Sequence, residues 1–97
     1  MNRIEFSNSI DDITSEDIIN SFDSIMALYN IVNDYDYKNI KISKQPDEIA
    51  SFDITFTKKE SVKSVIDLCD GMIVDIYDQK INIKCIENKT SIHIIFF

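Results

Sequence analysis

The chain has 97 residues, of which 44% are hydrophobic and 28% are charged, with one Gly and one Pro. This length supports one hydrophobic core and the apolar content is too high for disorder, so we expect a single domain over residues 1–97. The formal net charge of −7 disfavours direct binding to nucleic acid or to an anionic membrane, and no apolar stretch approaches the ~18 residues that cross a bilayer, which predicts a cytoplasmic protein.

The first predicted elements are a short strand at residues 3–6, a polar segment at residues 7–14 and then a helix. In the helix, apolar residues recur at spacings of four and three, which places them on one face: Ile18, Phe22, Ile25, Tyr29 and Val32. Thr14 is the predicted N-cap, and Asp17 lies three residues later, where it completes a capping box. Ile13 is expected to pack on Ile18 as a hydrophobic staple.

The opposite stripe of this helix carries no basic residue and consists of Glu16, Asn20, Asp23, Ala27, Asn30 and Asp34. Eight acidic residues and one arginine lie in the first 37 residues, whereas the nine lysines and nine acidic residues that follow cancel, so the whole net charge belongs to the first segment. A surface of a single sign steers association with the opposite charge. We therefore expect an acidic face that binds a cationic partner.

The remaining elements alternate between strands and one more helix. Strands are predicted at residues 39–43 and 51–57, with a turn around Pro46 between them. Thr57 and Glu60 predict a capping box for the second helix, and Gly71 predicts its end. The apolar face of that helix is Val62, Val65, Ile66 and Cys69. A hairpin is predicted from residues 72–77 and 80–86 around the turn Asp78-Gln79, followed by a last strand at residues 91–97.

This order of elements predicts an α+β fold. The first six elements follow the βαββαβ order of a ferredoxin-like split βαβ sandwich, in which two helices cover one face of an antiparallel sheet. We expect that sandwich to be extended by two C-terminal antiparallel strands. An alternative is an α+β domain in which the last three strands form a separate meander, because the sequence does not determine strand order.

Acidic and aromatic residues alternate after the first helix, in the segment Asn33-Asp34-Tyr35-Asp36-Tyr37. Carboxylates can stand where phosphates would lie, and tyrosine rings can stand where bases would stack. The segment is therefore a candidate for occupying a nucleic-acid channel of another protein. The alternative interpretation is a connection between helix and strand, with Tyr35 or Tyr37 packed at the edge of the core.

Residues that could perform chemistry are few. Cys69 and Cys85 lie on predicted apolar faces without a CxxC pair, so we expect buried free thiols. The single histidine, His93, lies in a strand and is expected at the core edge or in an interface. No spacing of acidic, His or Cys residues matches a metal site or a catalytic triad. We expect no enzyme activity, no metal and no cofactor.

The C-terminal sequence Ile94-Ile95-Phe96-Phe97 is apolar on both faces of a strand. In an inner strand these residues would belong to the core, whereas in an edge strand they would need a cover. Homodimerisation by strand pairing through residues 91–97 is therefore an open alternative.

Residues 52–86, FDITFTKKESVKSVIDLCDGMIVDIYDQKINIKCI, are similar to the strand-helix-strand-strand start of HPr-like phosphocarrier domains. The phosphorylatable histidine of that family would fall near Lys59, where this chain has no histidine. The resemblance, which covers about a third of the chain, therefore implies a related fold without the phosphotransfer chemistry.

At the level of class, the chain resembles small acidic inhibitors carried by mobile elements, such as anti-CRISPR proteins and immunity proteins of nuclease toxins. The resemblance is carried by the size, by the acidic segment from Asp11 to Asp36, and by a composition of 20 Ile and two Ala that is typical of a low-GC bacterium or its phage. It implies tight binding to a basic surface of a nuclease or an effector complex.

The leading hypothesis is a non-enzymatic inhibitor in the cytoplasm of a bacterial host cell. It would present six residues to the Lys- and Arg-lined site of a nucleic-acid-binding protein: Glu16, Asp23, Asp34, Tyr35, Asp36 and Tyr37. The alternative is a self-associating structural or regulatory module, of which a degenerate HPr-like domain is one form. It would pair through its C-terminal strand and use its acidic face for solubility only.

Overall fold

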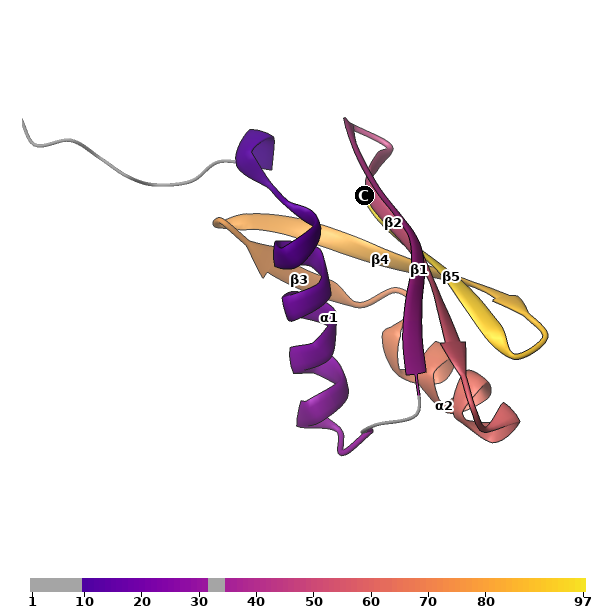
Figure 1. The fold of residues 1–97 in the computed structure, drawn as a ribbon. Helices are drawn as coiled ribbons and strands as arrows, with labels where there is room; N and C mark the ends of the chain where they lie inside the picture. The colour runs from indigo at the N-terminus through magenta and orange to yellow at the C-terminus, as the bar shows by residue number, and fades with distance from the viewer. Residues whose placement is uncertain (1–9, 32–34) are drawn as a thin grey trace, which may run out of the picture.

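The computed structural model describes residues 10–31 and 35–97, which form two helices and five strands (Figure 1). In chain order the elements are the 3-10 turn η1 (Ile10–Asp12), helix α1 (Ser15–Leu28), strands β1 (Tyr35–Gln45) and β2 (Glu48–Phe56), helix α2 (Lys59–Cys69), and strands β3 (Ile73–Ile76), β4 (Gln79–Asn88) and β5 (Ser91–Phe96). The predicted α+β class is confirmed. The predicted strand at residues 3–6 lies outside the described residues.

The five strands form one antiparallel sheet in the order β1-β2-β5-β4-β3. This order differs from the ferredoxin-like one, in which the first strand of the chain would lie beside the strand that is now β2. In the structure β5 lies beside β2. The last strand of the chain is therefore at the centre of the sheet, and it does not extend the edge of the sheet as predicted. The strands β3, β4 and β5 form a meander, as in our alternative, but β5 joins this meander to β2 and it is not separate.

The core lies between the two helices and one face of the sheet. Alternate residues of β2, β5 and β4 point into it, and both helices contribute to the same cluster of buried residues: Phe52, Ile54, Phe56, Ile92, Ile94, Phe96, Ile81 and Ile83 from the strands, and Ile18, Phe22, Ile25, Met26, Val62, Val65 and Cys69 from the helices. Phe52 is at the centre, with ring centroids at 5.2 Å from Phe22, 5.3 Å from Tyr37 and 5.9 Å from Phe96.

Helix α1 begins as predicted. The backbone N–H of Asp17 donates to Thr14 Oγ1 (3.2 Å) and the backbone N–H of Thr14 donates to Asp17 Oδ2 (2.9 Å), which completes the capping box. The predicted apolar stripe is buried as far as Ile25, after which Met26 takes the buried position. Tyr29 is the C-cap and is 49% exposed because the helix ends at Leu28. Val32 lies outside the described residues.

The predicted capping box of α2 is wrong. The N-cap is Lys58, which makes no side-chain capping bond, so Glu60 is the second helical residue and cannot reciprocate with Thr57. The predicted apolar face is confirmed at Val62, Val65 and Cys69, which are buried. Gly71 follows the C-cap at a φ of 83°, a left-handed conformation that glycine adopts without strain, as expected of a helix stop.

The turn between β3 and β4 lies one residue earlier than predicted. Its two central residues are Tyr77 and Asp78, which both have positive φ angles (52° and 63°), whereas we predicted Asp78 and Gln79. The predicted and the observed registers differ by two residues, so both place the same residues of β3 and β4 on the core face. The alternation of apolar residues therefore does not distinguish the two registers. Turn geometry decides the register, because a two-residue hairpin turn of this type requires positive φ at both positions.

The C-terminal strand β5 is an inner strand. It pairs with β2 on one side and with β4 on the other, and its residues Ile92, Ile94 and Phe96 are fully buried. Beyond the strand, the backbone of Phe97 still exchanges two hydrogen bonds with Asn82 (2.8 and 2.9 Å). Strand pairing between two copies through residues 91–97 would therefore have no free strand edge to use.

Candidate functional site

The structure brings three of the six predicted site residues together in one cluster. Asp23 lies on the flank of α1 that faces β1, and its Oδ1 atom accepts hydrogen bonds from the hydroxyl groups of Tyr35 (3.0 Å) and Tyr37 (2.5 Å). The two tyrosine rings pack edge to face at 5.6 Å, and Tyr37 also packs against Phe22 at 6.4 Å. We call Asp23, Tyr35 and Tyr37 the Asp23 cluster; it joins α1 to the edge strand β1.

The surroundings of the Asp23 cluster hold both phenols in their neutral form. Burial raises the pKa of Tyr37 strongly, and the hydrogen bond to Asp23 and its negative charge raise it further. The pKa of Tyr35 is raised by the same causes in the same order. A neutral phenol can donate to a carboxylate and an ionised one cannot, so the two hydrogen bonds depend on this protonation state.

Two of the other predicted site residues are exposed but lie on different surfaces. Glu16 is in the first turn of α1, seven residues before Asp23, or about 10 Å along the helix axis. Asp36 alternates with Tyr35 and Tyr37 along β1 and pairs with Thr55, so it belongs to the sheet face away from α1. Asp34 lies outside the described residues. The predicted site residues therefore do not form one surface, because Asp36 lies on the opposite face of the sheet from Glu16 and Asp23.

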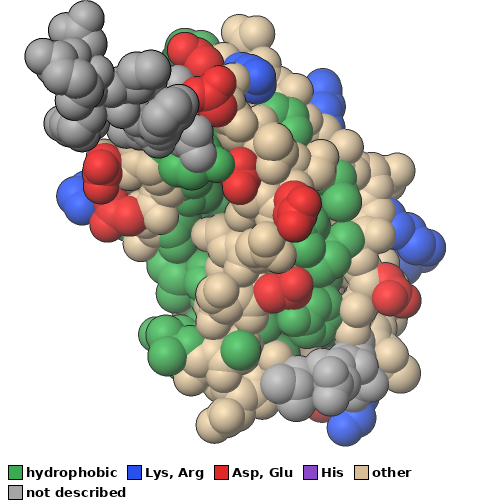
Figure 2. Space-filling view, turned by 60° about the vertical axis from the view of Figure 1, so that its left-hand side comes forward, with side chains coloured by type: hydrophobic (Ala, Val, Ile, Leu, Met, Phe, Trp, Pro, Cys, Tyr) green, Lys and Arg blue, Asp and Glu red, His purple; other side chains and the backbone are tan. Residues whose placement is uncertain are grey.

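The segment from η1 to α1 carries five carboxylates: Asp11, Asp12, Glu16, Asp17 and Asp23. Asp17 and Asp23 lie on opposite flanks of α1, toward the β3–β4 turn and toward β1. We call these five carboxylates the acidic surface. In Figure 2 carboxylates are spread over this face, and Lys side chains lie toward its margins. Lys44, from the end of β1, donates from Nζ to the backbone carbonyl oxygen of Asp11 (2.5 Å), a contact that the sequence did not indicate.

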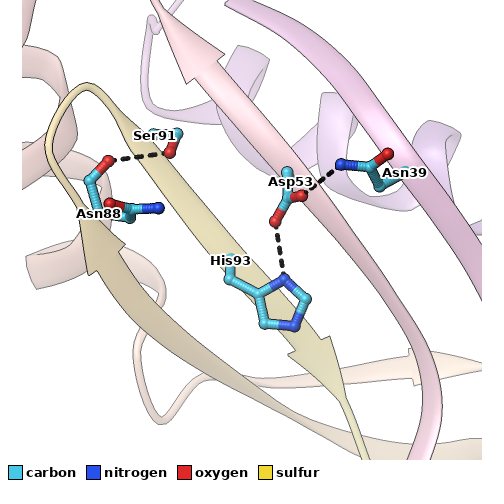
Figure 3. A network of polar contacts seen from close by, with 5 residues as sticks. All are labelled: Asn39, Asp53, Asn88, Ser91 and His93. Carbon is cyan, nitrogen blue, oxygen red and sulfur yellow. Dashed lines mark hydrogen bonds and ion pairs between the residues drawn. The ribbon is translucent and has the colours of Figure 1, made fainter.

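A second polar cluster lies on the opposite face of the sheet and was not found from the sequence. Asn39 Nδ2 donates to Asp53 Oδ2 (2.8 Å), and Asp53 Oδ1 is 2.7 Å from His93 Nδ1 (Figure 3). The three residues come from β1, β2 and β5, which are neighbours in the sheet. The hydrogen bond from Asn39 is the main cause of a lowered pKa of the Asp53 carboxyl, and His93 contributes to the same direction.

Asn39 reaches Asp53 because β1 contains a bulge. The register shifts between Lys38 and Lys41, and Asn39 has a positive φ of 56° there, which asparagine tolerates better than most residues. The sequence places Asp53 on the polar face of its strand and His93 on the same face as Ile95 and Phe97, but it does not show that β2 and β5 are neighbours. Strand order was the missing information.

The cluster around His93 has the geometry that orients an imidazole, with Nδ1 on a carboxylate. Ser91, two residues earlier on β5, donates its hydroxyl to the carbonyl oxygen of Asn88 (2.9 Å) and not to His93. In the part of the chain that the structure describes, no group of three or more His, Cys, Asp and Glu side chains is placed to hold a metal ion. Within the same residues, neither helix has the length and apolar character to cross a membrane.

The two cysteines are free, as predicted. Cys69 is buried at the end of α2 and Cys85 is partly buried on β4. Burial raises the pKa of the Cys69 thiol to about 11 and that of the Cys85 thiol to about 12, the latter with a further contribution from Cys69 and Asp70. Both thiols are therefore protonated at neutral pH, and only a small fraction is nucleophilic.

The Asp23 cluster predicts a specific response to alkali. The raised pKa values of Tyr35 and Tyr37 stabilise the fold fully below about pH 10, the ordinary tyrosine pKa, and this stabilisation is lost as the pH rises above it. We expect the ultraviolet absorbance of tyrosinate to show phenols that ionise only when the chain unfolds. Tyr37→Phe should remove one of these phenols from the titration, and a tyrosinate signal from Tyr37 in the folded protein would contradict the expectation.

The chain was compared with protein families, with curated proteins and with solved structures. No family matches it, and neither a curated protein nor a solved structure matches it.

Proposed function

We propose that the protein is a non-enzymatic inhibitor that binds the basic nucleic-acid site of a nuclease or a CRISPR effector complex through its acidic surface. The observation that carries the proposal is the one-sided charge of η1 and α1, where Asp11, Asp12 and Glu16 are exposed and no basic residue occurs in the sequence between Arg3 and Lys38. A cationic partner would be attracted by this field over about a Debye length, so association would be fast and salt-sensitive.

The Asp23 cluster supports the proposal by fixing α1 on the sheet. Because both tyrosine hydroxyl groups donate to Asp23, the helix that carries the carboxylates is held against the edge strand at a defined orientation. A preordered surface loses less conformational entropy on binding than a mobile one. In this proposal Glu16 contacts the partner and Asp23 positions the helix. Tyr35 and Tyr37 lie beside the helix, at the edge of the surface that the partner contacts.

Self-association is the second candidate, and no observation favours it over inhibition. Pairing through β5 would need an edge that β2 and β4 already occupy. Over residues 10–31 and 35–97 the sheet has its free edges at β1 and β3. The edge strand β1 carries two bulges and the side chains of Lys38, Lys41 and Lys44. Bulges and lysines of this kind oppose edge-to-edge pairing.

Charge neutralisation at exposed positions tests the proposal. In cleavage assays with CRISPR nucleases and toxin nucleases from low-GC bacteria, we expect wild-type protein to inhibit and Glu16→Gln to weaken inhibition by about tenfold, the effect of losing 1.4 kcal/mol of binding energy. Asp36→Asn should matter less, because Asp36 lies on the other face of β1. Neutralising Asp67 on α2 and Glu87 on β4, which are also exposed, is the matched control.

Three results would contradict the proposal. They are inhibition that is the same for wild type and Glu16→Gln, inhibition that the Asp67 and Glu87 controls reduce equally, and inhibition that does not weaken with added salt. The last result would indicate an interface whose energy does not depend on charge attraction.

A further inference from the structure

A groove runs beside α1 on the side away from the Asp23 cluster. It has a volume of about 350 Å³, and its lining residues come from α1 and from β3 with its turn: Asp17, Asn20, Ser21 and Ser24, and Asp75, Ile76 and Tyr77. We call it the α1–β3 groove. In Figure 2 a stripe of hydrophobic side chains runs down the face to the left of its centre, with carboxylates on both sides of its upper part. The lining of the groove itself is mostly polar, and Ile76 and Tyr77 are its apolar members.

One wall of the groove is a strand with a free edge. Among the described residues, β3 pairs with β4 alone and is the last strand of the sheet. The residues that flank the two-residue turn, Ile76 and Gln79, form a hydrogen-bonded pair, and such pairs alternate along an antiparallel ladder. It follows that the N–H and C=O groups of Asp75 and Ile73 point away from β4, toward the free edge.

The side chain and the backbone of Asp75 point in different directions. Its carboxylate is 3.3 Å from Lys80 Nζ, and both side chains are largely exposed on the outer side of the hairpin. What Asp75 contributes to the groove is therefore its backbone, with one donor and one acceptor. Ile73, the next residue with outward backbone groups, has a 59% exposed side chain, an apolar surface that nothing in the described residues covers.

The charges at the mouth of the groove favour one kind of occupant. Asp17 lies on the helix side of the groove. On the hairpin, Asp78 is in the turn, and the Asp75 carboxylate lies on the outer side, where Lys80 is paired with it. Asp17 is ionised at neutral pH, because hydrogen bonds from Tyr77 (2.7 Å) and from the Thr14 backbone lower its pKa. An incoming strand with Lys or Arg side chains would find Asp17 on its groove side, Asp75 on its outer side and the outward backbone groups of β3 along its length.

We propose that the α1–β3 groove binds an extended Lys- or Arg-bearing segment of the partner protein, added as a strand to the free edge of β3. Backbone hydrogen bonds to Asp75 and Ile73 would align the segment, its apolar side chains would pack beside the exposed Ile73, and its basic side chains would reach Asp17 and Asp75. This inference rests on the proposed function, which identifies the partner as a nuclease or a CRISPR effector complex. It assigns the contact to an extended basic segment and not to a flat basic surface.

The test uses a short capped peptide in which lysine and valine alternate. In amide NMR spectra of the full chain, we expect the resonances of β3 and of the groove side of α1 to shift on titration. Ser24→Arg, which adds bulk and positive charge at an exposed position of the groove wall, should weaken binding by at least about tenfold. The matched control is Ser64→Arg on α2, because Ser64 is also exposed and also donates its hydroxyl to the carbonyl four residues earlier.

Several outcomes would overturn the inference. They are shifts confined to β1 or to the outer sheet face, equal binding by the Ser24→Arg variant, and equal binding of a peptide in which glutamate replaces lysine. A dimer of the protein alone, measured by light scattering and abolished by Ser24→Arg, would mean that a second copy occupies the edge.

The groove and the proposed function can fail separately. Peptide binding that Ser24→Arg abolishes, without inhibition of any nuclease, would keep the groove and remove the proposed function. Inhibition that depends on Glu16 but not on Ser24 would keep the proposed function and remove the groove.

Discussion

Replacing Phe52 with alanine is expected to lower the free energy of unfolding by about 3–5 kcal/mol, which is a large share of the roughly 5–15 kcal/mol that a domain of this kind possesses. Phe52 is fully buried and its ring meets those of Phe22, Tyr37 and Phe96 at centroid distances of 5.2, 5.3 and 5.9 Å. Alanine would leave a cavity where α1, β1, β2 and β5 converge. Urea denaturation followed by circular dichroism measures the loss.

Phe97→Ala is the control for this measurement. Phe97 is also a C-terminal-half phenylalanine, but it is 39% exposed and its hydrogen bonds to Asn82 use the backbone. We expect a loss of less than about 1 kcal/mol, because the removed ring is incompletely buried. Equal losses for Phe52→Ala and Phe97→Ala would mean that the centre of the core is not at Phe52.

Asp23→Ala is expected to lower the free energy of unfolding by about 2–3 kcal/mol, since two hydrogen bonds to one carboxylate are lost and the hydroxyl of Tyr37 is left without its partner in a half-buried position. Asp23→Asn keeps a carbonyl acceptor and should lose less. The same denaturation measurement compares the two variants with wild type.

The control for Asp23 is Asp36→Ala, which removes a carboxylate between Tyr35 and Tyr37 in the sequence. Asp36 points to the opposite face of β1 and is exposed, so we expect a change within about 0.5 kcal/mol. A loss as large as that of Asp23→Ala would refute the structural role assigned to the Asp23 cluster.

These expectations constrain how the proposed function is tested. A variant of Asp23 would alter the attachment of α1 as well as the charge, so loss of inhibition by such a variant would not distinguish the two causes. Glu16 is exposed, and its substitution changes the charge with little effect on packing. Glu16 is therefore the informative position for binding, and Asp23 is the informative position for stability.

Local features of the chain were predicted well where a short stretch of sequence contains all the interacting groups. Thr14 and Asp17 are three residues apart, so their capping box needs nothing beyond the helix itself. The prediction failed for α2, where Thr57 and Glu60 have the same spacing but the helix starts one residue later, at Lys59. A capping motif shows that a helix begins nearby, while packing of Val62 and Val65 on the sheet decides the residue at which it begins.

The candidate site was predicted in part for the same reason. The sequence indicated that Asp23, Tyr35 and Tyr37 belong to one acidic and aromatic region, but not that the carboxylate accepts both hydroxyl groups. The link from Asn39 through Asp53 to His93 could not be predicted, because His93 is 40 residues from Asp53 in the chain and Asn39 reaches Asp53 through a bulge in β1.

By itself, the sequence determined the α+β class, the face of each helix that enters the core, and the one-sided distribution of charge, because periodicity and composition are properties of short segments. Only the tertiary structure decided the strand order, the register of the β3–β4 hairpin and the division of Asp36 from Glu16. Alternating apolar residues are compatible with several pairings of the same strands, and the choice among them depends on turn geometry and on which arrangement buries β5 at the centre.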